Sequence, residues 1–386
     1  MRDDTRLTHG QPSWELRSDT VELAITRVGG MIAPVSFFTD SDLPVRPYYV
    51  APWAEEGLEI DVPVLGPLRG DFFCMPFGAN ADTAGRYTVH GETATRPWSL
   101  AALAEESGGA HLTLQMELST PESRVTKDIW LRAGEPIIYT QHRIEGGSES
   151  VPLGHHATLA PPPTGRFRVS TSRFSFGLTA PRPEGAMVSD EYFALPPLAE
   201  FNRLEEVPTI WKSTPTLDYT IFPGVPGFSD ILSMNADPTL EYGWTAAVAE
   251  EAGYLWFSIK DPGVLPTTVM WVENGGRRGS PWLGRNQCIG LEEVCGFLAE
   301  GLPAAAESNP VSKRGVPTAI QLDPDQPTVI NYLQGVLRVE AGFGEVTEIQ
   351  LKSDRIVIRG SNGTEVSTPA AGEFVLTGKI PTGEIR

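Results

Sequence analysis

Residues 111–118 read HLTLQMEL, and apolar and polar side chains alternate along the whole stretch. The apolar positions are Leu112, Leu114, Met116 and Leu118. Because successive side chains of a β-strand point to opposite faces, this alternation predicts a strand with one face on a core and the other in water. Half-buried strands of this kind are typical of antiparallel sheets.

The segments on either side repeat the pattern. Residues 125–146, VTKDIWLRAGEPIIYTQHRIEG, predict a strand, a turn and a strand, and residues 14–38 predict two strands that meet near Gly29-Gly30. The 39 glycines and 34 prolines are scattered between such short runs, as expected for many strands joined by many turns. The one helix candidate spans residues 293–307, and Pro303 interrupts it. The chain therefore predicts an all-β, antiparallel architecture.

The length and composition suit one large β domain. Of 386 residues, 40% are hydrophobic and 20% are charged, so a packed core is expected. We expect residues 1–320 to form a sandwich domain. Residues 321–386 should add C-terminal strands that complete the same sandwich, after a boundary near residue 320.

The charge excludes several classes of partner. The formal net charge is −19, whereas binding to a phosphate backbone or an anionic membrane surface depends on Lys and Arg. No apolar run reaches about 18 residues, so no transmembrane helix is expected. The N-terminal segment lacks an apolar signal-peptide core, and three cysteines without CxxC spacing predict neither disulfides nor a zinc site. We expect a cytoplasmic protein that binds neither nucleic acid nor membranes.

Two adjacent carboxylates follow a short apolar run in CIGLEEVC, residues 288–295. In an extended backbone Glu292 and Glu293 must point to opposite faces, so one of them can face a cleft and act as a general base held by a rigid sheet. The alternative is that both are solvated surface glutamates. The sequence leaves open which of the two faces inward.

Histidines supply the matching acid. His155 and His156 are adjacent in GHHATL, so only one of them can face a given cleft. Imidazole, with a pKa of about 6.5, can protonate one substrate oxygen while a carboxylate deprotonates another. His90 precedes Gly91 and lies eight residues before Trp98, which suits contact with a sugar ring. His142 ends a predicted strand, and we expect it on the surface.

Other chemistries lack their motifs. The sequence contains no P-loop string, no GxSxG nucleophile elbow and no GxGxxG between a strand and a helix. Adjacent histidines also lack the spacing that places two metal ligands on one face. We therefore expect neither a nucleotide site nor a metal site.

Several stretches, taken in order, resemble the galactose mutarotase-like superfamily, which includes the aldose 1-epimerases. They are VELAITRVGGMIAPVSF, HGETATRPW, DIWLRAGEPIIYTQHRIEGGSESVPLGHHATL and CIGLEE, and the resemblance spans roughly residues 15–325. It implies an antiparallel β-supersandwich and an enzyme that interconverts sugar anomers without an organic cofactor or metal. It implies as partner a small-molecule carbohydrate, with the protein a monomer or a homodimer.

The resemblance also assigns roles. His156 matches the general acid on the ring oxygen, with His155 as the alternative, and Glu292 matches the general base on the anomeric hydroxyl, with Glu293 as the alternative. His90 matches the histidine that contacts the sugar. By position alone, the candidate pocket residues are His155, Arg69, Asp71, Trp271, Arg277 and Arg278. Asp218 and Asp230 are candidates for the family's sugar-binding aspartate.

Two other functions remain open. GHHATLA replaces the NHxYFNL phrase of the epimerases, which favours a carbohydrate-binding protein without turnover as one alternative. Arg277, Arg278 and Arg285 are clustered, and guanidinium groups suit carboxylates and phosphates. A lyase or isomerase acting on an acidic sugar is therefore the other alternative.

Overall fold

The computed structural model describes residues 5–81, 83–106, 109–181 and 191–380. Strands dominate the described chain, and their pairings are antiparallel, as the alternation predicts. The only α-helices in these ranges are α1 (Gly91–Thr95) and α2 (Phe374–Thr377). In the described chain no helix is long and apolar enough to cross a membrane.

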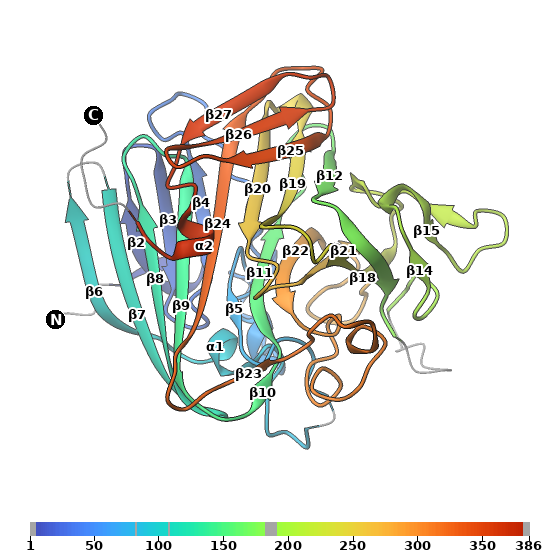
Figure 1. The fold of residues 1–386 in the computed structure, drawn as a ribbon, viewed down its shortest axis with the longest axis horizontal. Helices are drawn as coiled ribbons and strands as arrows, with labels where there is room; N and C mark the ends of the chain where they lie inside the picture. The colour runs from blue at the N-terminus through green and yellow to red at the C-terminus, as the bar shows by residue number, and fades with distance from the viewer. Residues whose placement is uncertain (1–4, 82, 107–108, 182–190, 381–386) are drawn as a thin grey trace.

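A nine-stranded sheet forms one layer of a sandwich (Figure 1). In spatial order its strands are β17 (Ile221–Phe222), β12 (Phe167–Thr171), β19 (Gly243–Ala249), β20 (Tyr254–Lys260), β24 (Thr328–Arg338), β9 (Ile137–Gly146), β8 (Glu122–Leu131), β7 (Gly109–Ser119) and β6 (Ser99–Glu106). The stretch HLTLQMEL lies in β7, where its apolar side chains are buried in the core.

A seven-stranded sheet faces it across the main core. Its strands are, in spatial order, β14 (Glu200–Phe201), β13 (Phe174–Thr179), β18 (Phe228–Ala236), β21 (Thr267–Asn274), β22 (Gln287–Cys295), β11 (Leu153–Leu159) and β5 (Phe73–Cys74). We call the face of this sheet that meets the nine-stranded sheet its back face, and the opposite face its front face.

The N-terminal strands form a four-stranded sheet that shares the same core. Its strands are β1 (Arg6–Thr8), β2 (Gln11–Arg17), β3 (Val21–Thr26) and β4 (Ile32–Phe37). Gly29 and Gly30 turn the chain between β3 and β4 with φ values of 78° and 56°, a left-handed conformation that glycine adopts without strain.

Residues 293–307 are not helical, contrary to the expectation from sequence. β22 extends to Cys295, and turns follow it. Cross-strand pairing with β11 outweighs the local helix preference, and Gly301 and Pro303 then favour turns over a helix. The shorter elements are η1 (Pro63–Leu65), β10 (Ser150–Val151), η2 (Leu204–Glu206), β15 (Val207–Pro208), β16 (Thr216–Leu217), η3 (Glu250–Ala252), η4 (Ser312–Arg314) and β23 (Ile320–Gln321).

The C-terminal segment divides between two layers. β24 is an inner strand of the nine-stranded sheet, whereas β25 (Val346–Leu351), β26 (Arg355–Gly360) and β27 (Glu365–Pro369) form a separate three-stranded sheet. This sheet and α2 bury a second apolar cluster against the outer face of the nine-stranded sheet, and they appear in red in Figure 1. The molecule thus has a third layer at its C-terminal end.

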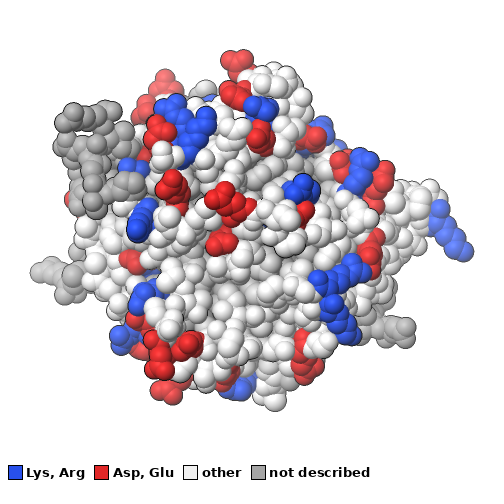
Figure 2. Space-filling view, viewed as in Figure 1, with Lys and Arg blue, Asp and Glu red and all other residues white. Residues whose placement is uncertain are grey.

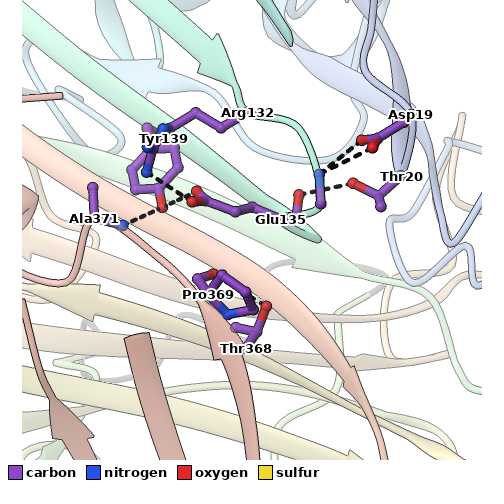
Figure 3. Close-up of polar contacts among 9 residues, drawn as sticks. Asp19, Thr20, Arg132, Glu135, Tyr139, Thr368, Pro369 and Ala371 are labelled. Atoms are coloured by element: carbon purple, nitrogen blue, oxygen red, sulfur yellow. Dashed lines mark hydrogen bonds and ion pairs between the residues drawn. The ribbon is translucent and has the colours of Figure 1, made fainter. Parts of the chain in front are cut away.

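A buried glutamate joins this third layer to the rest (Figure 3). Tyr139 donates its hydroxyl hydrogen to Glu135 over 2.6 Å and accepts the Ala371 amide over 2.9 Å. Arg132 donates to the same carboxylate, and Thr20, in the turn between β2 and β3, donates to the Glu135 carbonyl. Burial raises the pKa of Glu135. One polar cluster therefore connects the N-terminal sheet, the β8–β9 turn and the C-terminal layer.

The surface carries both signs of charge. Figure 2 shows Lys and Arg side chains scattered among Asp and Glu on the face drawn there. Exposed ion pairs such as Arg359 with Glu348 and Glu365 are examples.

Candidate active site

The register between β11 and β22 arranges the two adjacent histidines and the two adjacent glutamates. His156 lies opposite Glu292, and His155 lies opposite Glu293. Glu293 accepts hydrogen bonds from Thr245 and Ser258 of the nine-stranded sheet, which places it on the back face. Because neighbouring side chains alternate, His156 and Glu292 project together from the front face.

His156 and Glu292 contact each other directly. The distance from His156 Nε2 to Glu292 Oε1 is 3.2 Å, and the other ring nitrogen, Nδ1, lies 3.1 Å from Thr158 Oγ1. The Phe72 ring stacks on the imidazole with a centroid separation of 4.5 Å, and the Phe72 carbonyl accepts the His156 amide. Only 4% of His156 and 2% of Glu292 is exposed, so the pair is almost completely shielded from solvent.

Burial shifts both pKa values of this pair toward the neutral forms. It lowers the pKa of His156, with smaller contributions from His90 and Arg277, and it raises the pKa of Glu292 against the opposing effect of Arg277. Burial therefore favours the neutral imidazole and the protonated carboxyl over an ion pair between His156 and Glu292.

His90 completes the polar side of the site. Its ring meets His156 edge to face at 5.0 Å and also contacts Phe77. The Gly78 amide donates to His90 Nδ1 over 3.3 Å, which leaves the ring proton on Nε2. Burial lowers the pKa of His90 to about 3, so at neutral pH it is an uncharged donor. The following Gly91, with φ of 76°, lies too close to the Met75 carbonyl for any side chain.

Two tryptophans and an arginine pack together beside His156. Trp271 meets His156 edge to face at 5.9 Å, and the Arg277 guanidinium lies over the Trp271 and Trp282 rings at 5.1 and 4.9 Å. Arg277 Nε is 3.7 Å from Glu273 Oε2 and 3.4 Å from Glu191 Oε1. Burial raises the pKa of Glu273. Trp271 Nε1 and Glu273 Oε2 are buried without a hydrogen-bond partner.

Arg69, Asp71 and His155, which were expected in the pocket, lie elsewhere. Arg69 donates to the carbonyl oxygens of Pro67, Thr8 and His9. It therefore stabilises the N-terminal hairpin and does not contact His156 or Glu292. Asp71 and His155 point to the back face and contact each other there at 3.0 Å. The front face therefore holds His90, His156, Trp271, Arg277 and Glu292.

The two candidate sugar-binding aspartates are also remote from the pair. Asp218 and Asp230 line a separate cavity of about 430 Å³, together with Tyr219, Phe222 and Phe228. Asp230 accepts the Ala194 and Leu195 amides and the Tyr219 hydroxyl, so its carboxylate stabilises a turn.

The three clustered arginines do not converge on one anion. Arg277 is paired with Glu191 and Glu273, and Arg285 forms two hydrogen bonds with Glu56. Arg278 lies over the Tyr192 ring.

Phe72, Trp282 and Glu273 were missed as site residues. Alternation in DFFC, residues 71–74, separates Asp71 and Phe73 from Phe72 and Cys74, and this signal could have placed Phe72 beside His156. Trp282 lies in a loop, where periodicity gives no direction. Within the described ranges no group of three or more His, Cys, Asp or Glu side chains could hold a metal ion.

No protein-family model matches this chain, and no curated protein matches it. Solved structures do resemble it. A galactose mutarotase-like protein from Clostridium acetobutylicum superposes with a TM-score of 0.57 at 10% identity, covering 87% of this chain and 98% of that one. A galactose mutarotase related enzyme from Lactobacillus acidophilus gives 0.52 at 9% identity, covering 85% and 98%.

A galactose mutarotase-like protein from Lactobacillus casei gives a TM-score of 0.51 at 11% identity, covering 84% of this chain and 100% of that one. At such identities the likeness concerns the course of the backbone, not the chemistry. Together with the antiparallel sandwich described above, these superpositions show that the chain has the galactose mutarotase-like fold.

Proposed function

We propose that this protein interconverts the anomers of an aldose, as an aldose 1-epimerase does, with His156 and Glu292 as its acid and base. The observation that carries the proposal is the 3.2 Å contact between these two groups on the front face, where burial favours the neutral form of each.

The reaction requires what such a pair supplies. The ring oxygen and the anomeric hydroxyl of a cyclic aldose are bound to the same carbon, so two groups acting on them must lie close together. Glu292 takes the hydroxyl proton while His156 gives a proton to the ring oxygen, and the bond between the anomeric carbon and the ring oxygen breaks. The aldehyde then rotates, and ring closure returns both protons.

The resting protonation state suits this cycle. Ring opening leaves Glu292 protonated and His156 neutral, which is the arrangement that burial favours in the free protein. Starting a cycle from a closed sugar requires the proton to move from Glu292 to His156 across their contact. The nearby Arg277 cation favours the Glu292 carboxylate and so promotes that ionised form of the glutamate.

The surrounding groups suit a polyhydroxyl ligand. The Trp271 Nε1 hydrogen has no acceptor within the described protein. His90 has a ring proton on Nε2, and Glu273 Oε2 accepts no hydrogen bond although it lies 3.7 Å from Arg277 Nε. Unpaired buried donors and acceptors are costly, and sugar hydroxyls would satisfy them.

Anomer exchange measured by NMR on a panel of neutral and acidic aldoses tests the proposal. Wild-type protein should accelerate exchange of at least one sugar. Glu292→Gln should lower that rate by about 100-fold or more, the usual contribution of a positioned acid or base. Glu117→Gln, an equivalent change of an exposed glutamate paired with Arg124, is the matched control and should leave the rate unchanged.

Two outcomes would contradict the proposal. Exchange that is as fast with E292Q as with wild type would exclude Glu292 as the base. Binding of sugars without any acceleration would instead support a carbohydrate-binding protein.

A further inference from the structure

A buried polar cluster lies directly behind the candidate site, between the two large sheets. We call it the inter-sheet cluster, and each of its side chains is at most 6% exposed. Its members are Tyr48, Asp71, Lys127, Thr140, His142, His155, Tyr332 and Gln334. His142 is completely buried here, contrary to the expectation that it lies on the surface, because it shares the inward face of β9 with Thr140. A second buried polar group, Glu293 with Lys260, lies between the same two sheets.

Hydrogen bonds run through this cluster from one sheet to the other. Trp256 donates to the Tyr48 hydroxyl over 3.1 Å, and Tyr48 donates to Gln334 Oε1 over 2.7 Å. Gln334 Nε2 donates in turn to Asp71 Oδ2 over 3.0 Å. His155 Nδ1 donates to the same oxygen, also over 3.0 Å. Asp71 is therefore the point at which the nine-stranded sheet is connected to β11.

The two residues that contact each other on the back face are each followed in the sequence by a residue of a second contact, on the front face. Asp71 is followed by Phe72, and His155 is followed by His156. At the front, the Phe72 ring stacks on the His156 ring with an interplanar angle of 16°. The contact between Asp71 and His155 thus links the same two backbone segments from the opposite face.

Backbone hydrogen bonds join these two segments from Gly70 to Phe77. β5 is paired with β11 at only two positions, Cys74 with Gly154 and Phe73 with His155. Outside the two paired positions, the amides of His156, Thr158 and Phe77 donate to the carbonyls of Phe72, Gly70 and Pro152. These bonds align the two backbones, and the contact between Asp71 and His155 adds a side-chain link across the same segments.

The cluster is incompletely satisfied, which argues against a role in stability alone. Asp71 Oδ1, His155 Nε2 and both ring nitrogens of His142 are buried without a protein partner. Such groups oppose folding, and apolar side chains would fill the same space at lower cost.

We propose that Asp71 is a positioning residue, which acts through His155 to hold the His156 ring against Phe72 and beside Glu292. The catalytic consequence rests on the proposed function, whereas the structural consequence does not. Asp71→Asn is the test, since the amide keeps the size of the carboxylate but replaces its charged acceptor with a neutral one, and hydrogen bonds to a charged acceptor are about twice as strong. Glu135→Gln is the matched control, an equally buried carboxylate that also accepts hydrogen bonds and lies far from the site.

The first measurement is independent of activity. In protein labelled with ¹³C-histidine, the ring resonances of His156, assigned with His156→Gln, should move in D71N as the ring leaves the shielding region of Phe72. They should not move in E135Q. Unchanged His156 resonances in a folded D71N would overturn the proposal, whatever the activity.

The second measurement is the rate of anomer exchange. A displaced imidazole should lower kcat by about 100-fold in D71N. KM should change little, because the other residues proposed to contact the sugar are not altered. Moved resonances without any exchange by the wild type would uphold Asp71 and reject the proposed function. Moved resonances with an unchanged kcat would reject the catalytic part of the Asp71 proposal.

A second variant covers the case in which D71N does not fold. Gln334→Met removes the other hydrogen bond to Asp71 and keeps the contact with His155. The His156 resonances should then move in the same direction as in D71N but by less. No movement in folded Q334M, with D71N unfolded, would also overturn the proposal.

Discussion

At the scale of single residues, the candidate site depends on how burial changes the proton affinity of two side chains. His156 and Glu292 have ordinary pKa values near 6.5 and 4.5, in the order that favours an ion pair. Burial penalises both charged forms and moves the two pKa values in opposite directions. The two shifts widen the pH range in which the imidazole is neutral while the carboxyl is protonated.

The pH profile follows from these directions. Activity requires one proton on the pair, so it should decline on the acid side below the lowered pKa of His156, at a pH under 6.5. On the alkaline side it should decline only above the raised pKa of Glu292, well above 4.5. A broad plateau between the two limbs is the expected result, measured as the pH dependence of anomer exchange. An acid limb at or above pH 6.5 would contradict it.

Arg277 should set the position of this plateau. Its cation lowers the pKa of His156 and also lowers the pKa of Glu292, so Arg277→Gln should move both limbs to higher pH. Arg355→Gln, at an exposed arginine of β26, is the control and should leave both limbs in place. If only one limb moves, the two groups do not titrate as a pair.

At the scale of the elements, the register of β11 against β22 decides which residues meet. Because side chains alternate, the same pairing that brings His156 to Glu292 brings His155 beside Glu293 on the other face. Glu293 is there paired with buried Lys260 and accepts hydrogen bonds from Thr245, Ser258 and Thr268. One strand pair thus carries the candidate acid and base in front and, behind, Glu293 held by Lys260 of β20.

Removing one partner of the back pair should be costly. Lys260→Met leaves the Glu293 carboxylate buried without a cation, and the free energy of unfolding should fall by about 3–5 kcal/mol. Urea denaturation measures this loss. The double variant K260M/E293Q should lose less than the sum of the two single changes, because no uncompensated charge remains. Additive losses would show that the two groups are not coupled. The exposed pair Arg124 and Glu117 should show far weaker coupling.

At the scale of the whole molecule, the C-terminal layer and the candidate site lie on opposite sides of the sandwich. The site is on the front face of the seven-stranded sheet, and β25–β27 with α2 cover the outer face of the nine-stranded sheet. Phe374 anchors this layer, with its ring edge to face against Tyr139 at 5.2 Å and Trp130 at 5.9 Å.

Substitutions in this layer should therefore lower the stability of the protein without lowering its activity. Phe374 is completely buried, so Phe374→Ala should lower the free energy of unfolding by about 3–5 kcal/mol, through lost transfer energy and the cavity left behind. Anomer exchange at temperatures where the variant stays folded should match that of the wild type. Leu376→Ala, in the same helix at a side chain that is 37% exposed, is the control and should change little. A large loss of activity in folded F374A would show that the layers are coupled.

Alternation along the chain was sufficient to predict the all-β, antiparallel class, because burial of one sheet face imposes a period of two on the sequence itself. The same rule required that Glu292 and Glu293, and likewise His155 and His156, face opposite ways. The order of short motifs, through the family resemblance, was also sufficient to bring His90, the His155–His156 pair and the Glu292–Glu293 pair into one candidate set. The alternation rule depends only on neighbours in the sequence once the segment is extended.

Only the tertiary structure decided which member of each adjacent pair faces the site. That choice depends on the register of two strands separated by about 130 residues and on which sheet covers which face. Long-range packing also moved Arg69, Asp71 and His155 away from the expected pocket and buried His142 inside the core. Arg69 illustrates the reason: its partners are carbonyl oxygens of Thr8 and His9, and no local pattern records that a distant hairpin will lie there.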